Sequence, residues 1–104
     1  MNKREEMLVI TMEECGELIQ ACSKLLRFGE NQDHTQIQEE IGDVMCMIEI
    51  LCDQGIVTQE KIRERIEIKK EKLRKWSELF VDEMNPMNNL ELMVEFSIRS
   101  PRVK

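Results

Sequence analysis

The chain has 104 residues, a net charge of −6 and 41% hydrophobic residues. This length fits one domain with a modest core, and a core of this size favours burial shared between subunits. The acidic balance argues against direct nucleic-acid binding. No apolar run is long enough to span a bilayer, and the opening MNKREEM does not resemble a signal peptide, so we expect a soluble cytoplasmic protein without membrane contacts.

Four cysteines are spaced without any C-x-x-C pair: Cys15, Cys22, Cys46 and Cys52. Three of them occupy apolar positions of a helical repeat. The pattern therefore predicts buried free thiols rather than disulfides or zinc ligands.

Helical periodicity dominates the first three quarters of the chain. Residues 3–28 carry an apolar stripe at 8, 12, 15, 19, 22 and 26, and Gly29 is a suitable stop. Thr35 and Gln38 fit a capping box that opens a second helix, which we expect to end before Gly55.

Thr58 is expected to cap a third helix that extends to about Phe80. The predicted fold class is therefore all-α, a helical hairpin plus a third helix. After Asn85-Pro86 apolar residues alternate from Leu90 to Ile98, which predicts a short strand-like tail pairing with its copy in another subunit. A tail ordered only by packing is the alternative. We divide the chain into a helical domain, 1–82, and a C-terminal tail, 83–104.

A six-residue motif occurs twice. EECGEL at 13–18 returns 26 residues later as EEIGDV at 39–44, with an acidic pair, a glycine and a third acid in the same places. A glycine inside a helix costs about 1 kcal/mol relative to alanine. The repetition therefore indicates a packing or functional role for both copies.

The acids of the two motifs occupy equivalent faces. Measured from the centre of each apolar stripe, Glu14 and Glu17 fall at roughly 260° and 200°, and Glu40 and Asp43 fall at the same angles. Apolar residues lie within or beside these faces, so each helix is apolar on two sides. The pattern predicts carboxylates that point into a lined pocket or a subunit interface. The neighbouring apolar residues are Ile10, Leu18, Ala21, Leu25 and Met47.

Four inward carboxylates require a counterion, because desolvating each charge costs several kcal/mol. Oxygen ligands alone favour hard divalent ions, Mg²⁺ first and Mn²⁺ next. A di-iron bundle would need Glu-x-x-His, and the single histidine, His34, lies in the expected loop. A solvated acidic helix face is the plainer alternative, but the doubled motif argues against it.

The pattern Glu13-Glu14-x-x-Glu17, followed by Glu40-x-x-Asp43 on the next helix, resembles the metal-binding signature of MazG-like all-α nucleoside triphosphate pyrophosphohydrolases. The likeness covers residues from about 8 to 76. It implies Mg²⁺-dependent hydrolysis of a nucleoside triphosphate between its α- and β-phosphates, giving the monophosphate and pyrophosphate. It also implies a homodimer or homotetramer in which hairpins assemble into a four-helix-bundle-like oligomer.

The resemblance assigns roles by position. Glu14, Glu17, Glu40 and Asp43 would be metal ligands. Glu13 would support a ligand or orient the attacking water, so Glu13 and Glu17 are the expected catalytic residues.

Basic residues of the third helix are candidates for the phosphates. Lys69 and Lys72 share a face with Trp76, within KKEKLRKW at 69–76. We expect both lysines to contact phosphate and Trp76 to stack on the base; a snorkelling lysine and a core tryptophan are the alternatives. Lys24, near the angle of Glu17, is a further candidate, although a plain surface lysine is equally consistent with the pattern.

Three functions remain open on sequence alone. The first is the pyrophosphohydrolase, with a deoxynucleotide suggested as its substrate by the resemblance to compact phage or bacterial forms. The second is a non-catalytic acidic helical module for dimerisation or regulation. The third, a partner-binding antitoxin-like protein, is supported only by charge and size.

Overall fold

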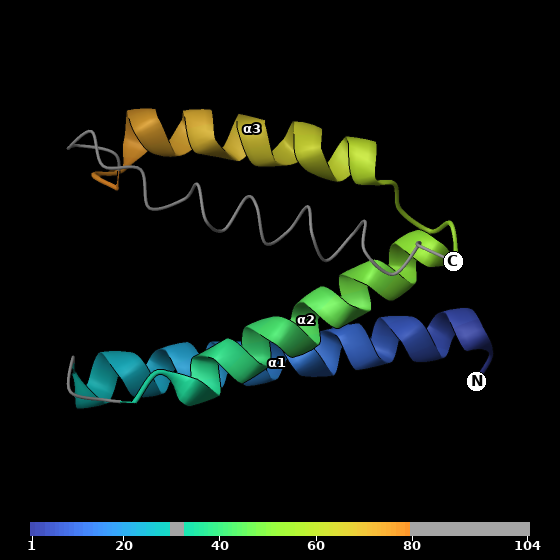
Figure 1. Cartoon of the computed structure of the whole chain (residues 1–104), viewed down its shortest axis with the longest axis horizontal. Coiled ribbons are helices and arrows are strands. Elements are labelled where there is room, and N and C mark those ends of the chain that lie inside the picture. The colour runs from blue at the N-terminus through green and yellow to red at the C-terminus, as the bar shows by residue number, and fades with distance from the viewer. Residues whose placement is uncertain (30–32, 80–104) are drawn as a thin grey trace. The chain divides into compact units, whose positions relative to one another are not determined.

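The structure is a computed structural model, and it describes residues 1–29 and 33–79. Three helices occupy these residues: α1 (Lys3–Phe28), α2 (Thr35–Asp53) and α3 (Gln59–Trp76) (Figure 1). The described ranges contain no strand, which confirms the all-α fold class. The strand predicted at 90–98 and the boundary predicted at 82/83 lie outside them.

The chain divides into two compact units. The first, Met1–Leu51, contains α1 and nearly all of α2, and the second begins at Cys52 and contains α3. In the first unit the two helices run antiparallel as a hairpin (Figure 1). None of the described helices combines the length and the apolar character that crossing a membrane requires.

α1 begins with a capping box and ends at a glycine. Asn2 Oδ1 accepts a hydrogen bond from the Glu5 amide at 2.8 Å, and Glu5 Oε1 accepts one from the Asn2 amide at 3.1 Å. Two amides at the helix start are thereby satisfied. Gly29, at φ 83°, donates its amide to the Leu25 carbonyl at 3.0 Å. Only glycine adopts that conformation without strain, and the predicted bounds of this helix are confirmed.

α2 begins at a cap that differs from the predicted one. Asp33 Oδ1 accepts from both the amide and the hydroxyl of Thr35, at 3.1 and 2.8 Å. These bonds stabilise the ionised carboxylate and lower the pKa of Asp33. The predicted capping box of Thr35 and Gln38 is wrong, because the Gln38 amide donates to the His34 carbonyl instead. An ionised carboxylate is a stronger acceptor than a hydroxyl, so Thr35 acts as a donor.

α3 starts as predicted but ends earlier. Thr58 Oγ1 accepts from the Lys61 amide at 3.2 Å. At the other end, the amide and hydroxyl of Ser77 both donate to the Leu73 carbonyl, each at 2.9 Å. Ser77 has an extended backbone and caps the helix after Trp76, so the predicted end at Phe80 is wrong.

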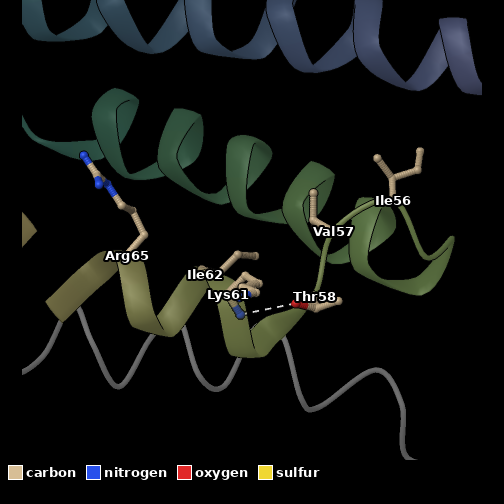
Figure 2. A pocket seen from close by; sticks show the side chains of 6 residues that line it. All are labelled: Ile56, Val57, Thr58, Lys61, Ile62 and Arg65. Carbon is tan, nitrogen blue, oxygen red and sulfur yellow. Dashed lines mark hydrogen bonds between the residues drawn. The ribbon is translucent and has the colours of Figure 1, made fainter. Parts of the chain in front are cut away.

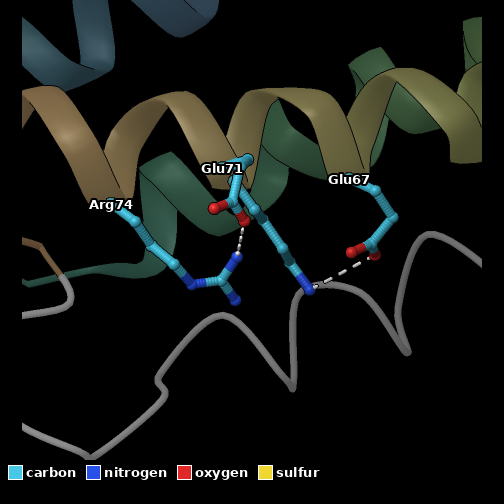
Figure 3. Close-up of polar contacts among 4 residues, drawn as sticks. Glu67, Glu71 and Arg74 are labelled. Carbon is cyan, nitrogen blue, oxygen red and sulfur yellow. Dashed lines mark hydrogen bonds and ion pairs between the residues drawn. The ribbon is translucent and has the colours of Figure 1, made fainter.

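Acidic and basic side chains pair one turn apart along α3. The Arg74 guanidinium donates a hydrogen bond to Glu71 Oε1 at 2.8 Å, and Lys70 Nζ lies 3.7 Å from Glu67 Oε2 (Figure 3). The exposed Glu71–Arg74 pair contributes only a few tenths of a kcal/mol. Lys70 is 6% exposed and is the buried charged residue among those described. Lys69, which the sequence places close to the apolar stripe, is exposed.

The hairpin buries the apolar face that carries the acids. Ala21 is 2% exposed, and Ile10, Leu18 and Leu25 beside it are half-buried. A fully buried apolar side chain of methionine or leucine size contributes about 1.5–3 kcal/mol. The other buried side chains of this unit are Met7, Met45, Met47 and Leu51.

The apolar stripe of α1 at positions 8, 12, 15, 19, 22 and 26, here called the outer stripe, lies outside the hairpin. This placement corrects the cysteine prediction. None of the four cysteines forms a disulfide, and Cys52 is buried, but Cys15, Cys22 and Cys46 are exposed. Cys15 and Cys22 belong to the outer stripe, so helical apolar spacing placed them on a face that the hairpin does not cover.

Candidate metal centre

The antiparallel hairpin brings the two acidic motifs together at the middle of α1 and α2. Glu14 on α1 and Glu40 and Asp43 on α2 each offer a carboxylate oxygen, and these three oxygens all lie within 4.8 Å of one another. Glu14 and Glu40 are half-buried, whereas Asp43 is exposed. A cluster of three oxygens at this spacing suits a hard divalent cation.

Burial and mutual repulsion shape the electrostatics of the cluster. Burial raises the pKa of Glu14 above its ordinary value, and the charge of Asp43 adds to the effect. Burial likewise raises the pKa of Glu40, here reinforced first by the charge of Glu17. The two helices thus face each other with carboxylates in crossed pairs, Glu14 with Asp43 and Glu17 with Glu40.

Two buried oxygens in the cluster lack hydrogen-bond donors. Oε1 of Glu14 and Oε1 of Glu40 have no partner among the described residues. Facing carboxylates have no hydrogen to share when both are ionised, so each buried oxygen requires a proton or a cation. The donor set is therefore suited to a divalent metal ion.

The remaining two acids of the first motif lie beside this cluster. Glu17 is exposed and outside the three-oxygen group, yet it is close enough to Glu40 to be the strongest charge acting on it. Glu13 is also exposed and contributes to the raised pKa of Glu14. Both carboxylates therefore reach solvent next to the cluster.

A protein-family model covers both acidic motifs and most of the chain. The model of the MazG nucleotide pyrophosphohydrolase domain matches residues 2–76. The chain belongs to the MazG nucleotide pyrophosphohydrolase family. Comparisons with curated proteins and with solved structures found no match.

A groove of about 360 Å³ follows α1 of this MazG domain toward its C-terminus. Lys24 lies in it, half-buried, together with Arg27, and both belong to the same unit as the carboxylates. Sequence reasoning singled out Lys24 alone. Residues 20, 24 and 27 are spaced to share one helix face, and this spacing could have predicted the other polar residues of the groove. Ile19, Gln20 and Ser23 complete it.

The other predicted substrate residues are on α3, in the second unit. Lys69 and Lys72 are exposed, and Trp76 is 82% exposed. The structure shows these side chains accessible to a ligand. Their contacts with phosphate or base remain predictions.

The second unit of this MazG domain also has a cavity, about 410 Å³, at the start of α3. Figure 2 shows its lining, which is Ile56, Val57, Thr58, Lys61, Ile62 and Arg65. Within this lining, Thr58 Oγ1 accepts the capping hydrogen bond from the Lys61 amide. Arg65, which shares a helix face with Lys69, lies in this cavity, but no described acidic motif belongs to the same lining.

Proposed function

We propose that this MazG domain is a Mg²⁺-dependent pyrophosphohydrolase that cleaves a nucleoside triphosphate between its α- and β-phosphates. The observation that carries the proposal is the cluster of Glu14, Glu40 and Asp43, whose oxygens lie within 4.8 Å while two buried oxygens lack a partner. An oxygen-only donor set favours Mg²⁺, with Mn²⁺ as a substitute.

The proposed ligands are Glu14, Glu17, Glu40 and Asp43. When bound there, Mg²⁺ supplies neutralisation of the charge on phosphate oxygens and polarisation of the anhydride. Glu17 joins the set because its carboxylate lies near Glu40 and is exposed, so it can turn toward an ion at the cluster edge.

Glu13 and Glu17 are the proposed catalytic carboxylates. Each is exposed next to the cluster, where it can accept a hydrogen bond from a water molecule and orient it toward the substrate. The water oxygen forms a bond to phosphorus as the α–β anhydride bond breaks. The products are the nucleoside monophosphate and pyrophosphate, and the carboxylate takes the proton from the water.

Lysines of both units are proposed to bind the phosphates. Lys24 lies on the helix that carries the first acidic motif, in a groove with a second cation, Arg27. Lys69 and Lys72 are exposed on α3, where Trp76 offers an aromatic face to the base. A deoxynucleotide is the proposed substrate, and a homodimer or homotetramer is the proposed assembly.

A turnover screen tests the function. All common ribo- and deoxynucleoside triphosphates are incubated with the full chain and Mg²⁺, then with Mn²⁺, and the products are separated by chromatography. Monophosphate with pyrophosphate supports the proposal, and release of phosphate alone contradicts the position of cleavage. A folded chain without turnover under either metal would favour the non-catalytic helical module.

A further inference from the structure

The first unit offers few cations to an anionic substrate. Lysine and arginine occur at only four positions of residues 1–51, and α2 carries none of them. Lys3 and Arg4 lie at the start of α1, before the acidic motif, whereas Lys24 and Arg27 follow it. Side chains on a helix lean toward its N-terminus, so Lys24 and Arg27 lean toward the acids and the first pair leans away from them.

Neither Lys24 nor Arg27 is neutralised by an acidic side chain. Within residues 1–29 and 33–79 the two form no ion pair, although three basic residues of α3 each do. Lys24 is nevertheless half-buried, and the Cζ atom of Arg27 lies 5.5 Å from the centroid of the Phe28 ring. A guanidinium stacked on a ring keeps its N–H edge available for hydrogen bonds. The groove therefore presents two cations to an anion.

The groove continues the line of the acidic motif along α1. Two acids of the motif and three residues of the groove follow one another at steps of four and three residues, which places them on one helix face. These residues are Glu13, Glu17, Gln20, Lys24 and Arg27. At a rise of about 1.5 Å per residue, Lys24 and Arg27 lie about 10 and 15 Å beyond Glu17, and their long side chains span part of that distance. A triphosphate held at the cluster by its α-phosphate extends by about one helix turn, so its terminal phosphate would be within reach of both cations.

We propose that the α1 groove receives the β- and γ-phosphates of the substrate and that Arg27 recognises the γ-phosphate. The proposal rests on the hydrolysis proposed above, and it adds the direction of the substrate along α1 and the residue that selects triphosphates over diphosphates. A guanidinium presents two parallel N–H donors, which match the free oxygens of a terminal phosphate. Lys24, one turn closer to the acids, contacts the β-phosphate.

The residues of the groove favour phosphates over the base. Four of its five side chains can donate hydrogen bonds, and Ile19 is the single apolar residue in this lining. A base binds best to an apolar or aromatic surface on which it can stack. The two phosphates that leave as pyrophosphate then lie on the side of the cluster toward Arg27, and the nucleoside lies on the other side.

Equilibrium binding tests the groove without turnover. The probes are α,β-methylene analogues of the deoxynucleoside tri- and diphosphates of each common base, in which a carbon replaces the bridging oxygen so that the α–β bond is not hydrolysed. Calorimetry with the full chain and Mg²⁺ should show that the best-bound triphosphate analogue binds about tenfold or more tightly than its diphosphate counterpart. Arg27→Ala should weaken triphosphate binding about tenfold or more and leave diphosphate binding unchanged. Arg27→Lys keeps the charge without the paired donors, so it should restore part of the difference.

Arg4→Ala is the matched control, because it removes the same exposed charge at the far end of the same helix. It should bind both analogues like the wild type, and circular dichroism should be the same for all variants. A wild type that binds both analogues equally, or neither of them, overturns the proposal. Unchanged triphosphate binding in Arg27→Ala does so as well.

The pattern of loss in Arg27→Ala shows which part of the nucleotide the residue meets. Equal loss of tri- and diphosphate binding, or a loss confined to one base, would place Arg27 away from the γ-phosphate and overturn the proposal. A chain that binds as expected but releases no pyrophosphate from natural triphosphates refutes only the hydrolase. Pyrophosphate release with a KM that Arg27→Ala leaves unchanged refutes only the role of the groove.

Discussion

The carboxylate of Glu14 on α1 faces that of Asp43 on α2 across the hairpin, and the charge of Asp43 adds to the burial that raises the pKa of Glu14. Such a pair is unfavourable in a hairpin held together by few buried side chains. The same contact is favourable once a cation or a proton lies between the carboxylates. We therefore expect folding of this domain to be coupled to the occupancy of its acidic cluster.

The metal-free protein should lose stability as pH rises. The folded state binds protons at Glu14 and Glu40 more tightly than the unfolded chain, because their pKa values are raised when folded. Their stabilising contribution is complete below the unfolded pKa and is lost as pH rises through the folded pKa. Thermal unfolding in a chelator, followed from pH 4.5 to 7.5, measures this contribution.

A double variant isolates the contribution of the cluster to that pH profile. Glu14→Gln with Glu40→Gln should flatten the decline with pH, whereas Glu39→Gln, which removes an exposed charge outside the cluster, should not. Addition of Mg²⁺ should raise the melting temperature of the wild type at pH 7 and leave that of the double variant unchanged. Parallel profiles for wild type and double variant would contradict the coupling.

Removal of a single carboxylate should separate metal binding from folding. Asp43→Asn leaves the shape of the side chain but removes a ligand charge, so Mn²⁺ affinity measured by titration should fall 10- to 100-fold or more. Turnover should fall on the order of a hundredfold or more, while metal-free stability rises because repulsion at Glu14 is relieved. Glu39→Gln is again the control, and unchanged Mn²⁺ affinity in the Asp43 variant would exclude Asp43 as a ligand.

Local signals in the sequence predicted most of the hairpin. Periodicity gave the bounds of α1, Gly29 marked its end, and Thr58 capped α3 as expected. The doubled motif placed Glu14, Glu17, Glu40 and Asp43 at one expected site, and the structure brings oxygens of Glu14, Glu40 and Asp43 within 4.8 Å of one another, with Glu17 outside that group. The helix ends depend on residues within one or two turns of each other, whereas the cluster depends on a motif that returns 26 residues later on the next helix.

Other features depended on which of two competing interactions is stronger, and the spacing of residues in the sequence does not reveal that. α1 has two apolar faces, and only the structure shows that the hairpin covers the one carrying Glu14 rather than the one carrying Cys15. At the start of α2, the Asp33 carboxylate is a stronger hydrogen-bond acceptor than the Thr35 hydroxyl, and it takes the capping role that the sequence suggested for Thr35. Similarly, Ser77 ends α3 although the apolar repeat continues beyond it.

Two glycines should respond to alanine in opposite directions. At Gly42 an added Cβ meets nothing within 4 Å of the described residues, so Gly42→Ala should stabilise α2 by about 1 kcal/mol. Gly55 has φ 77°, and Gly55→Ala should destabilise the chain by about 1–2 kcal/mol through left-handed strain. Urea unfolding of both variants measures the difference. A loss of stability at Gly42 would show that an unseen neighbour packs against it in solution.

Lys24 is the proposed phosphate contact whose loss should act on substrate binding more than on chemistry. Its side chain lies in the α1 groove with Arg27, on the helix that carries Glu14. A charged hydrogen bond contributes about 1.5–3 kcal/mol, so Lys24→Ala should raise KM about tenfold or more. The proposed contact would be made in both the bound substrate and the transition state, so kcat should change much less. Steady-state kinetics with the preferred triphosphate distinguishes the two parameters.

Lys24→Arg should restore much of the affinity, and Lys3→Ala, at the far end of the same helix, should match the wild type. A fall in kcat at constant KM would instead place Lys24 among groups that act only in the transition state.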